Sequence, residues 1–372
     1  MPSTRLSSKH SAVSWLESLS PWPEEFGLGR MRALLRELGD PQTRFPSIHV
    51  VGSNGKTTTT LMIEAILRGA GLAAGATVSP HVRSWDERIT VGDFERAVAR
   101  VRPAAERVEA TQFEVVVAAA FSEFAEVGVD AAVVEAGLGG RLDATNVIDA
   151  PVVVLTNVAL EHTDVLGATR EEIAAEKLAV VKPGATVVLS EREWEGPARE
   201  RGAGRVVPIG RTNVELAEAA AEAFLGRPAD AAPALEVHPP GRLERRGERP
   251  LEIWDGAHNA AGVDWLLAHL PARRYVVVTS VLRDKDAKAM LGALAGVADW
   301  IVATRSSNPR AVPADELAAE APAPAEVVDD PAQALERARA LAGPDGAVLV
   351  TGSLYLLQDL SIQAPAYHDE TR

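Results

Sequence analysis

The sequence predicts an α/β protein of two domains, each built on a parallel sheet with helices on both faces. Three observations lead to this fold class. The chain has 372 residues, which is too long for one ordinary hydrophobic core. Short β-branched runs alternate with helical patterns along most of it, as in parallel sheets with crossover helices. A Pro- and Ala-rich stretch between Gly226 and Gly241 lacks periodicity, so we place the boundary near His238 and expect domains of residues 1–238 and 239–372.

Eight apolar runs have the length and the β-branched content of strands, and helical patterns lie between them. The predicted strands are 47–51, 131–135, 152–156, 186–190, 251–254, 275–279, 300–304 and 347–350. Helices are predicted at 61–67, 94–110, 114–126, 170–180 and 214–224. Ligands of parallel α/β folds bind at the carboxyl ends of the strands, so the side chains that follow each run are the candidates for a site.

Composition excludes several classes of protein. Hydrophobic content of 47% and charged content of 24% are those of a globular protein. No apolar run is long enough to span a membrane and no secretory segment opens the chain, so we expect a cytoplasmic protein. The chain has no cysteine, which excludes disulfides, thiolate zinc sites and a cysteine nucleophile. A net charge of −14 argues against wide contact with nucleic acid or anionic membrane.

Basic side chains are dense in one place only, between Arg242 and Arg249. Glutamates interrupt this run, so we interpret most of it as the solvated face of a strand. Anionic ligands must therefore enter through small local basic pockets.

The segment from Val50 to Thr58 predicts a phosphate-binding loop. It follows the apolar run 47–51 and leads into the helix 61–67, and this order builds a pocket for nucleotide phosphates. Backbone N–H groups of the turn would face the phosphates, Lys56 would add a positive charge, and Thr57 or Thr58 would place a hydroxyl on Mg²⁺. The general pattern has glycine where Val50 stands, and the alternative is a tight turn that only begins a helix.

Polar side chains follow other strands of the first half. Glu135 ends the run 131–135, where a magnesium ligand belongs, and Asp143 in the glycine-rich segment after it offers a substrate contact. His162 is a candidate metal ligand, although a lone histidine is more often an ordinary loop residue. Ser79 precedes a proline that could aim its hydroxyl at the same region. Lys177 lies in a predicted helix, and the pattern alone leaves it as surface charge.

In the second half, Asp255, His258 and Asn259 follow the run 251–254 and suit hydrogen bonding to a nucleotide or an amino acid. Lys285 and Ser353 likewise follow apolar runs. Each alone would be an ordinary loop residue.

Together these segments resemble the folylpolyglutamate synthase and dihydrofolate synthase family of the Mur ligase superfamily. The likeness covers most of the chain, with its motifs in order. They are Trp15 to Leu19, Gly29 to Leu35, the phosphate loop, Ser79-Pro80-His81, Asp86 to Ile89, Glu135 to Val147, Leu160 to Pro183, Pro240-Gly241-Arg242, Asp255 to Asn259, Asp284-Lys285-Asp286 and Thr351 to Leu356.

The resemblance implies a P-loop NTPase-like first domain, a smaller Rossmann-like second domain, and ATP-dependent ligation of L-glutamate to dihydropteroate or a folate. The acceptor carboxylate would receive the γ-phosphate, and the glutamate amine would attack the resulting acyl phosphate. ATP and Mg²⁺ would be the cofactors and a monomer the expected state. The linker would act as a hinge that closes the two domains over the substrates.

The resemblance also assigns roles to individual residues. The triphosphate would lie on Gly52, Ser53, Asn54, Gly55, Lys56, Thr57 and Thr58. Ser79 and Glu135, with Thr57, would hold one magnesium and His162 a second, and Lys177 corresponds to a lysine that is carbamylated into a metal ligand. Asp143 would contact the pterin-bearing substrate. From the second domain Arg242, Asp255, His258 and Asn259 would reach ATP or glutamate, with Ser353 and Lys285 as weaker assignments.

The chain departs from the family pattern at two residues and in length, and the difference in length bears on substrate choice. Thr57 replaces a glycine, and Glu161 replaces the aspartate expected before His162. The stretches 190–213 and 91–93 are shorter than the family's, which favours dihydropteroate as acceptor over folates with long glutamate tails. The alternatives are a Mur-type ligase acting on another carboxylate, such as a muramyl peptide, and a non-catalytic nucleotide-binding relative.

Overall fold

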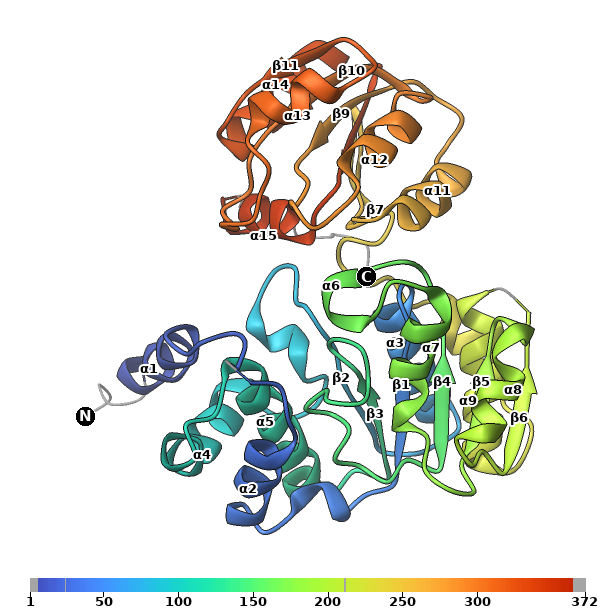
Figure 1. Cartoon of the computed structure of the whole chain (residues 1–372). Helices are drawn as coiled ribbons and strands as arrows, with labels where there is room; N and C mark the ends of the chain where they lie inside the picture. Colours follow the sequence, from blue (N-terminus) through green and yellow to red (C-terminus); the bar gives the residue numbers. More distant parts are fainter. Residues whose placement is uncertain (1–5, 24, 211, 364–372) are drawn as a thin grey trace. The chain divides into compact units, whose positions relative to one another are not determined.

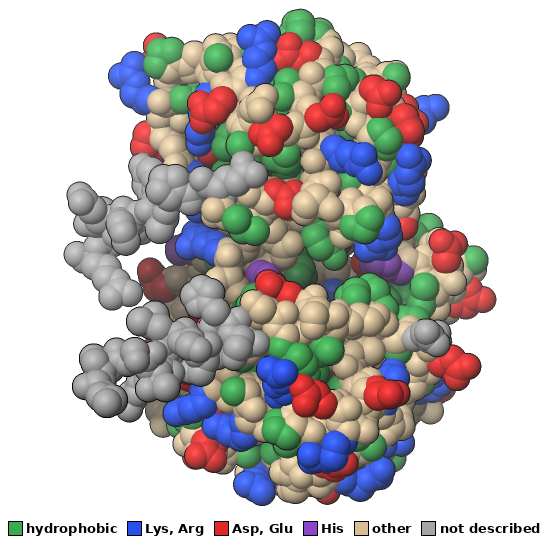
Figure 2. Space-filling view, turned by 90° about the vertical axis from the view of Figure 1, so that its left-hand side faces the viewer, with side chains coloured by type: hydrophobic (Ala, Val, Ile, Leu, Met, Phe, Trp, Pro, Cys, Tyr) green, Lys and Arg blue, Asp and Glu red, His purple; other side chains and the backbone are tan. Residues whose placement is uncertain are grey.

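The computed structural model describes residues 6–23, 25–210 and 212–363 (Figure 1). Two compact units divide the chain, Met1–Val237 and His238–Arg372. No helix among the described residues is long and apolar enough to cross a membrane. Acidic and basic side chains are interspersed on the face of each unit that Figure 2 presents.

The first unit contains a six-stranded parallel sheet in the order β2-β3-β1-β4-β5-β6. Burial of whole strands on both faces explains their continuous apolar runs. Two strands were not predicted: β2 is buried but consists only of Ala, Gly and Thr, and β6 is only partly buried at the sheet edge. The strands are β1 (Ser47–Val51), β2 (Ala74–Thr77), β3 (Ala131–Glu135), β4 (Val152–Leu155), β5 (Thr186–Leu189) and β6 (Arg205–Pro208).

Helices cover both faces of this sheet, as predicted. Helix α3 (Lys56–Gly69), α9 (Asn213–Leu225) and the short α10 (Ala232–Leu235) pack on one face. The opposite face carries α4 and α5 beside β3, and α7 and α8 beside β4 and β5. The remaining bounds are α1 (Leu6–Glu17), α2 (Gly29–Glu37), α4 (Phe94–Arg107), α5 (Gln112–Val127), α6 (Thr163–Leu166), α7 (Arg170–Lys177) and α8 (Glu195–Glu200).

Local signals start these helices where the sequence places them. Thr111 with Glu114 and Thr169 with Glu172 form capping boxes that satisfy the first backbone N–H groups of α5 and α7. Helix α10 lies inside the stretch predicted to be a linker, and it packs against α3, where a Cβ on Gly69 would touch Pro233. Its four residues are too few to give a periodic signal.

The second unit contains a six-stranded sheet in the order β11-β10-β9-β12-β8-β7. Five strands are parallel, but β7 pairs antiparallel with β8, so the expectation of a wholly parallel sheet was wrong at this edge. Residues 249 and 250 alone join β7 to β8, and so short a connection can only form a hairpin. The strands are β7 (Glu244–Glu248), β8 (Leu251–Trp254), β9 (Tyr275–Thr279), β10 (Ala298–Ala303), β11 (Ala325–Val327) and β12 (Ala347–Thr351).

Strand β7 holds most of the predicted basic run, and its charges are paired within the strand. Arg245 pairs with Glu248 in solvent, and Arg246 pairs with Glu244 while covering the ring of Trp254. Around the sheet, α11 to α13 pack on one face and α14 and α15 belong to the other. These helices are α11 (Ala260–His269), α12 (Ala287–Leu294), α13 (Ala314–Glu320), α14 (Pro331–Ala342) and α15 (Leu354–Gln363).

Candidate active site

The phosphate loop connects β1 to α3 and depends on two glycines. Gly52 has φ 148°, and a Cβ there would collide with the hydroxyl of Thr156. Gly55 has φ 81° at the start of α3, a conformation that side chains rarely adopt. The Lys56 ammonium donates to the carbonyls of Gly52 at 2.9 Å and Ser53 at 3.0 Å. The lysine therefore lies along the loop, where it can meet phosphate oxygens.

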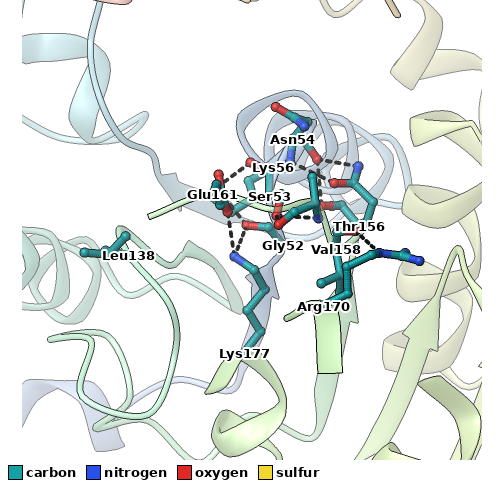
Figure 3. Close-up of polar contacts among 12 residues, drawn as sticks. Gly52, Ser53, Asn54, Lys56, Leu138, Thr156, Val158, Glu161, Arg170 and Lys177 are labelled. Atoms are coloured by element: carbon teal, nitrogen blue, oxygen red, sulfur yellow. Dashed lines mark hydrogen bonds and ion pairs between the residues drawn. The ribbon is translucent and has the colours of Figure 1, made fainter. Parts of the chain in front are cut away.

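The end of β4 holds this loop in place (Figure 3). Asn157 accepts from the N–H of Asn54 at 2.9 Å and donates back to its carbonyl at 3.0 Å. Thr156 donates to the same carbonyl at 2.7 Å, and Ser53 accepts from the N–H of Ala159 at 3.0 Å. The loop is thus fixed by hydrogen bonds before any nucleotide binds.

Glu135 links the phosphate loop to the loop after β2. Its buried carboxylate accepts from the Thr57 hydroxyl at 3.0 Å and from the N–H of Ser79 at 2.9 Å. Three of the predicted metal ligands therefore meet at the carboxyl ends of β1, β2 and β3. A carboxylate beside a hydroxyl at a helix N-terminus provides the hard oxygen donors that Mg²⁺ prefers. The contact also favours Thr57 over Thr58 as the hydroxyl ligand.

A Glu135→Gln variant is expected to need more metal. The amide keeps the size of the side chain but removes its charge, so the half-saturating Mg²⁺ concentration for turnover should rise at least ~10–100-fold, the cost typical of losing a supporting group at a metal site. Metal titration of ATP turnover measures this. Glu64→Gln is the matched control, since Glu64 is an equally buried carboxylate that pairs with Arg68 and Thr90. An unchanged Mg²⁺ requirement in Glu135→Gln would contradict the assignment.

Lys177 is the last residue of α7 and is 1% exposed, so it is not the surface charge that the helix pattern taken alone would suggest. Its ammonium donates to Glu161 Oε1 at 2.9 Å and to the carbonyl of Gly52 at 2.8 Å, directly beneath the phosphate loop (Figure 3). Burial lowers the pKa of Lys177, and the charge of Lys56 adds to this effect while Glu161 opposes it. Burial alone would raise the pKa of the Glu161 carboxyl, but the charges of Lys177 and Lys56 hold that pKa well below its ordinary value.

His162 follows Glu161 at the start of the short helix α6, with φ 46°. Left-handed backbone is uncommon for a residue with a side chain and is met most often at turns and functional sites. Among the described residues, no three His, Asp or Glu side chains gather closely enough to hold a metal ion. The predicted magnesium ligands are not a cluster of that kind. Besides Glu135 and His162 they include hydroxyl groups and a modified lysine.

Asp143 lies inside the loop that follows β3, and it is 7% exposed. One carboxylate oxygen accepts from the N–H of Leu138 at 2.8 Å, and the other accepts from the N–H of Thr145 at 3.0 Å and from its hydroxyl. Burial raises the pKa of Asp143, although these hydrogen bonds act against the rise. The structure thus gives Asp143 a role in shaping this loop, and its substrate contact stays a prediction.

His49 was missed by the sequence analysis. It is 1% exposed in the middle of β1, and its Nε2 lies 2.8 Å from the Thr145 hydroxyl. Burial, with a smaller effect from the charge of Lys182, lowers its pKa to about 3. The available signal was a single histidine in an apolar strand directly before the phosphate loop.

The buried histidine predicts a specific loss of stability in acid. Between pH 6.5 and pH 3 the unfolded chain binds a proton at His49 and the folded chain does not, so the free energy of unfolding falls as the pH falls. The contribution of one such group is about 1.4 kcal/mol per pH unit. Urea unfolding at several pH values should therefore give a smaller acid slope for His49→Gln than for the parent chain. Equal slopes would mean that His49 is protonated in the folded state.

The second unit places its predicted residues on the loop after β8. Asp255 is buried and accepts from the N–H groups of Leu243 and Ala257, both at 2.8 Å. Burial raises its pKa, and the charge of Arg242 opposes the rise. His258 Nδ1 donates to the carbonyl of Gly256 at 2.9 Å, which fixes the proton of the neutral ring on Nδ1.

Three further residues of this unit have local roles. Asn259 caps α11 by accepting from the N–H of Gly262 at 2.7 Å. Ser353 accepts from the N–H of Tyr355 at 3.1 Å, and Lys285 pairs with Asp284 at 3.2 Å. The contacts of Asn259 and Ser353 are of a kind common at helix starts, so they do not by themselves mark a ligand site.

Comparisons with known proteins agree with this geometry. The Mur ligase middle domain model matches residues 50–220, and the Mur ligase glutamate ligase domain model matches residues 241–354. The chain is 34% identical to the dihydrofolate synthase/folylpolyglutamate synthase of Mycobacterium tuberculosis, over 80% of this chain and 78% of that protein.

Solved structures of this family have the same fold. Folylpolyglutamate synthase of M. tuberculosis complexed with ADP superposes with a TM-score of 0.87 at 30% identity, covering 96% and 98% of the two chains. A bifunctional folylpolyglutamate synthase/dihydrofolate synthase with Mn, AMPPNP and L-glutamate bound gives a TM-score of 0.83 at 28% identity, covering 95% and 97% of the two chains. These matches confirm the predicted fold class. The chain therefore belongs to the folylpolyglutamate synthase/dihydrofolate synthase family, whose members are ATP-dependent ligases of the Mur ligase superfamily.

Proposed function

We propose that this chain uses ATP and a divalent metal to join L-glutamate to the carboxylate of dihydropteroate or of a folate. The observation that carries the proposal is the group formed by the phosphate loop, the Glu135–Thr57 contact and the buried Lys177–Glu161 pair, all at the carboxyl ends of one sheet. Relatives carry the corresponding names, and a neighbouring structure binds Mn, a nucleotide analogue and L-glutamate.

The chemistry follows from the poor electrophilicity of a carboxylate at neutral pH. Transfer of the γ-phosphate to the acceptor carboxylate gives an acyl phosphate, and attack by the glutamate amine releases inorganic phosphate and forms the amide. Backbone N–H groups of residues 52–58 and the Lys56 ammonium would bind the triphosphate and stabilise charge on the transferred group. Thr57, Ser79, Glu135 and His162 would hold Mg²⁺. When bound, the ion would neutralise further charge on the phosphates.

Lys177 would act as a carbamate. Its lowered pKa favours the neutral amine that attacks CO₂, a reaction that forms an N–C bond and releases one proton. The product carries a negative charge at the end of the side chain, where it becomes a metal ligand. The ion pair with Glu161 describes the unmodified side chain, and the carbamate would turn toward the metal instead.

For the acceptor, we propose a preference for dihydropteroate. The alignment with the M. tuberculosis relative spans 381 positions for 80% of a 372-residue chain, so that relative carries segments that this chain lacks. The short stretch 190–213 still forms α8 and β6, so its shortness does not remove the edge strand. The proposal places the missing segments beside the acceptor, where their loss would suit a substrate without a polyglutamate tail.

The proposal extends to the second unit and to the state of the protein. We assign ATP or glutamate binding to Arg242, Asp255, His258, Asn259 and Ser353. The enzyme is proposed to work as a monomer in the cytoplasm, a compartment that supplies ATP. Sedimentation of the purified protein tests the oligomeric state, and a dimer at micromolar concentration would exclude the monomer.

The proposed function is tested by ADP release with ATP, Mg²⁺ and L-glutamate, with dihydropteroate or tetrahydrofolate supplied separately. We expect acceptor-dependent ADP release and a product heavier by one glutamyl unit, with dihydropteroate used faster. Equal turnover of both acceptors would remove the stated preference. ATP binding without turnover of either would indicate another acceptor or a non-catalytic protein.

A further inference from the structure

A buried histidine in the middle of β1 needs an explanation that packing does not supply. His49 lies between Val134 of β3 and Val153 of β4, and the strand around it is wholly buried. Burying an imidazole costs free energy unless its N–H finds a partner, and an aliphatic side chain would fill the same place at lower cost. The contact at Nε2 is therefore the feature that distinguishes His49 from its neighbours.

That contact is the first step of a chain of hydrogen bonds. The Thr145 hydroxyl donates its one proton to Asp143, so it must accept from His49, which fixes the proton of the imidazole on Nε2. Asp143 in turn accepts from the backbone N–H groups of Leu138 and Thr145. His49, Thr145 and Asp143 form what we call the relay. It ties the centre of the sheet to the loop from Gly137 to Asn146.

The loop held by the relay packs against the end of α7, where Lys177 lies. The N–H of Arg141 donates to the carbonyl of Glu176 at 3.1 Å, and the two side chains form an ion pair at 2.8 Å. A Cβ on Gly140 would lie 2.7 Å from the carbonyl oxygen of Lys177, so the two backbones are in direct contact. The charge of Asp143 also acts on the Lys177 ammonium.

We propose that His49 is a positioning residue for the ligase reaction. Through Thr145 and Asp143 it fixes the loop 137–146, and the loop fixes the end of α7, so that Lys177 reaches the underside of the phosphate loop. The predicted effect on kcat rests on the proposed function. The hydrogen bonds of the relay do not. The phosphate loop depends on the relay only through the single contact of Lys177 with the Gly52 carbonyl, because residues 156–159 hold the loop through several hydrogen bonds of their own.

The experiment compares His49→Leu, His49→Gln and Thr145→Val. His49→Leu and Thr145→Val each break the relay, whereas His49→Gln keeps an N–H donor near the Nε2 position. The matched control is Thr60→Val, which makes the same change at a buried site of this unit where the hydroxyl has no hydrogen-bond partner. The readouts are kcat, KM for the acceptor, the Kd for ATP, and backbone hydrogen exchange in peptides covering 137–146 and 52–60.

We expect His49→Leu and Thr145→Val to lower kcat by about 10–100-fold, the cost of an ångström-scale misplacement of a group at the reaction centre. In both variants backbone hydrogen exchange should become faster in residues 137–146 and stay constant in residues 52–60, and the Kd for ATP should change less than about twofold. The His49→Gln variant should recover most of the parent kcat. Two results would overturn the proposal: faster exchange in 137–146 with unchanged kcat, or an equal fall in kcat in Thr60→Val. If the parent chain shows no turnover, the proposed function fails, and exchange alone still decides whether the relay holds the loop.

Discussion

A Lys56→Met variant is expected to lose ligase turnover by on the order of 10²–10³-fold, the loss typical of removing one preorganised charge at a developing transition state. The Lys56 ammonium lies within 3.0 Å of two carbonyls of the loop, so it is held where phosphate oxygens would bind. Methionine keeps the length of the side chain and removes its charge. The fold should persist, because Glu161, whose pKa the Lys56 charge helps to lower, keeps its ion pair with Lys177.

The measurement is kcat and the ATP KM by coupled ADP release, with thermal unfolding as the check on folding. Lys288→Met is the matched control, since Lys288 is an exposed lysine on α12 in the second unit. Turnover of Lys56→Met within threefold of the parent enzyme would show that the loop does not bind the transferred phosphate.

A Lys177→Met variant is expected to lose both activity and stability. In protein kept free of CO₂ and metal, where Lys177 is unmodified, removing the lysine leaves Glu161 buried without its partner, and breaking a buried pair in this way costs about 3–5 kcal/mol. The pKa of Glu161, now held low mainly by Lys177, should rise once that charge is gone. Turnover should fall to the detection limit, since methionine cannot form the carbamate proposed for Lys177.

A second variant separates the two losses. Glu161→Gln/Lys177→Met removes both charges, so it should recover most of the stability while remaining inactive. Urea unfolding and ADP release measure the two properties on the same samples. Carbon-13 NMR with labelled bicarbonate should show a carbamate signal in the parent enzyme only. Recovery of turnover in the double variant would mean that Lys177 has a purely structural role.

The sequence was sufficient to predict most of the strands that carry the site, because β1, β3 and β8 are buried on both faces and so have continuous apolar runs. It was insufficient at the sheet edges. Strand β6 is partly exposed, and the highly charged β7 is anchored by its hairpin to β8. Neither β6 nor β7 therefore leaves a clear apolar pattern, and the edge strand β2 was missed although its Ala, Gly and Thr residues are buried.

The sequence could locate the site at the strand ends but could not predict which of its side chains contact one another. Candidates at strand ends followed from the fold class, but the contact of Glu135 with Thr57 depends on β3 lying beside β1, an order that no local pattern encodes. Lys177 has the helix position of a surface lysine, and its burial comes from tertiary contacts with the loop 137–146, with Gly52 and with Glu161. His49 escaped notice because its partner, Thr145, is 96 residues away in the sequence.

The most direct test of the proposed chemistry follows one oxygen atom. Turnover is run with dihydropteroate labelled with ¹⁸O in its carboxylate, and the inorganic phosphate and the amide product are analysed by mass spectrometry. If the acceptor carboxylate attacks the γ-phosphate and the glutamate amine then displaces phosphate, each phosphate formed carries one ¹⁸O and the amide keeps the other. Phosphate without ¹⁸O, formed alongside the glutamyl product, would contradict an acyl phosphate and with it the role given to the phosphate loop.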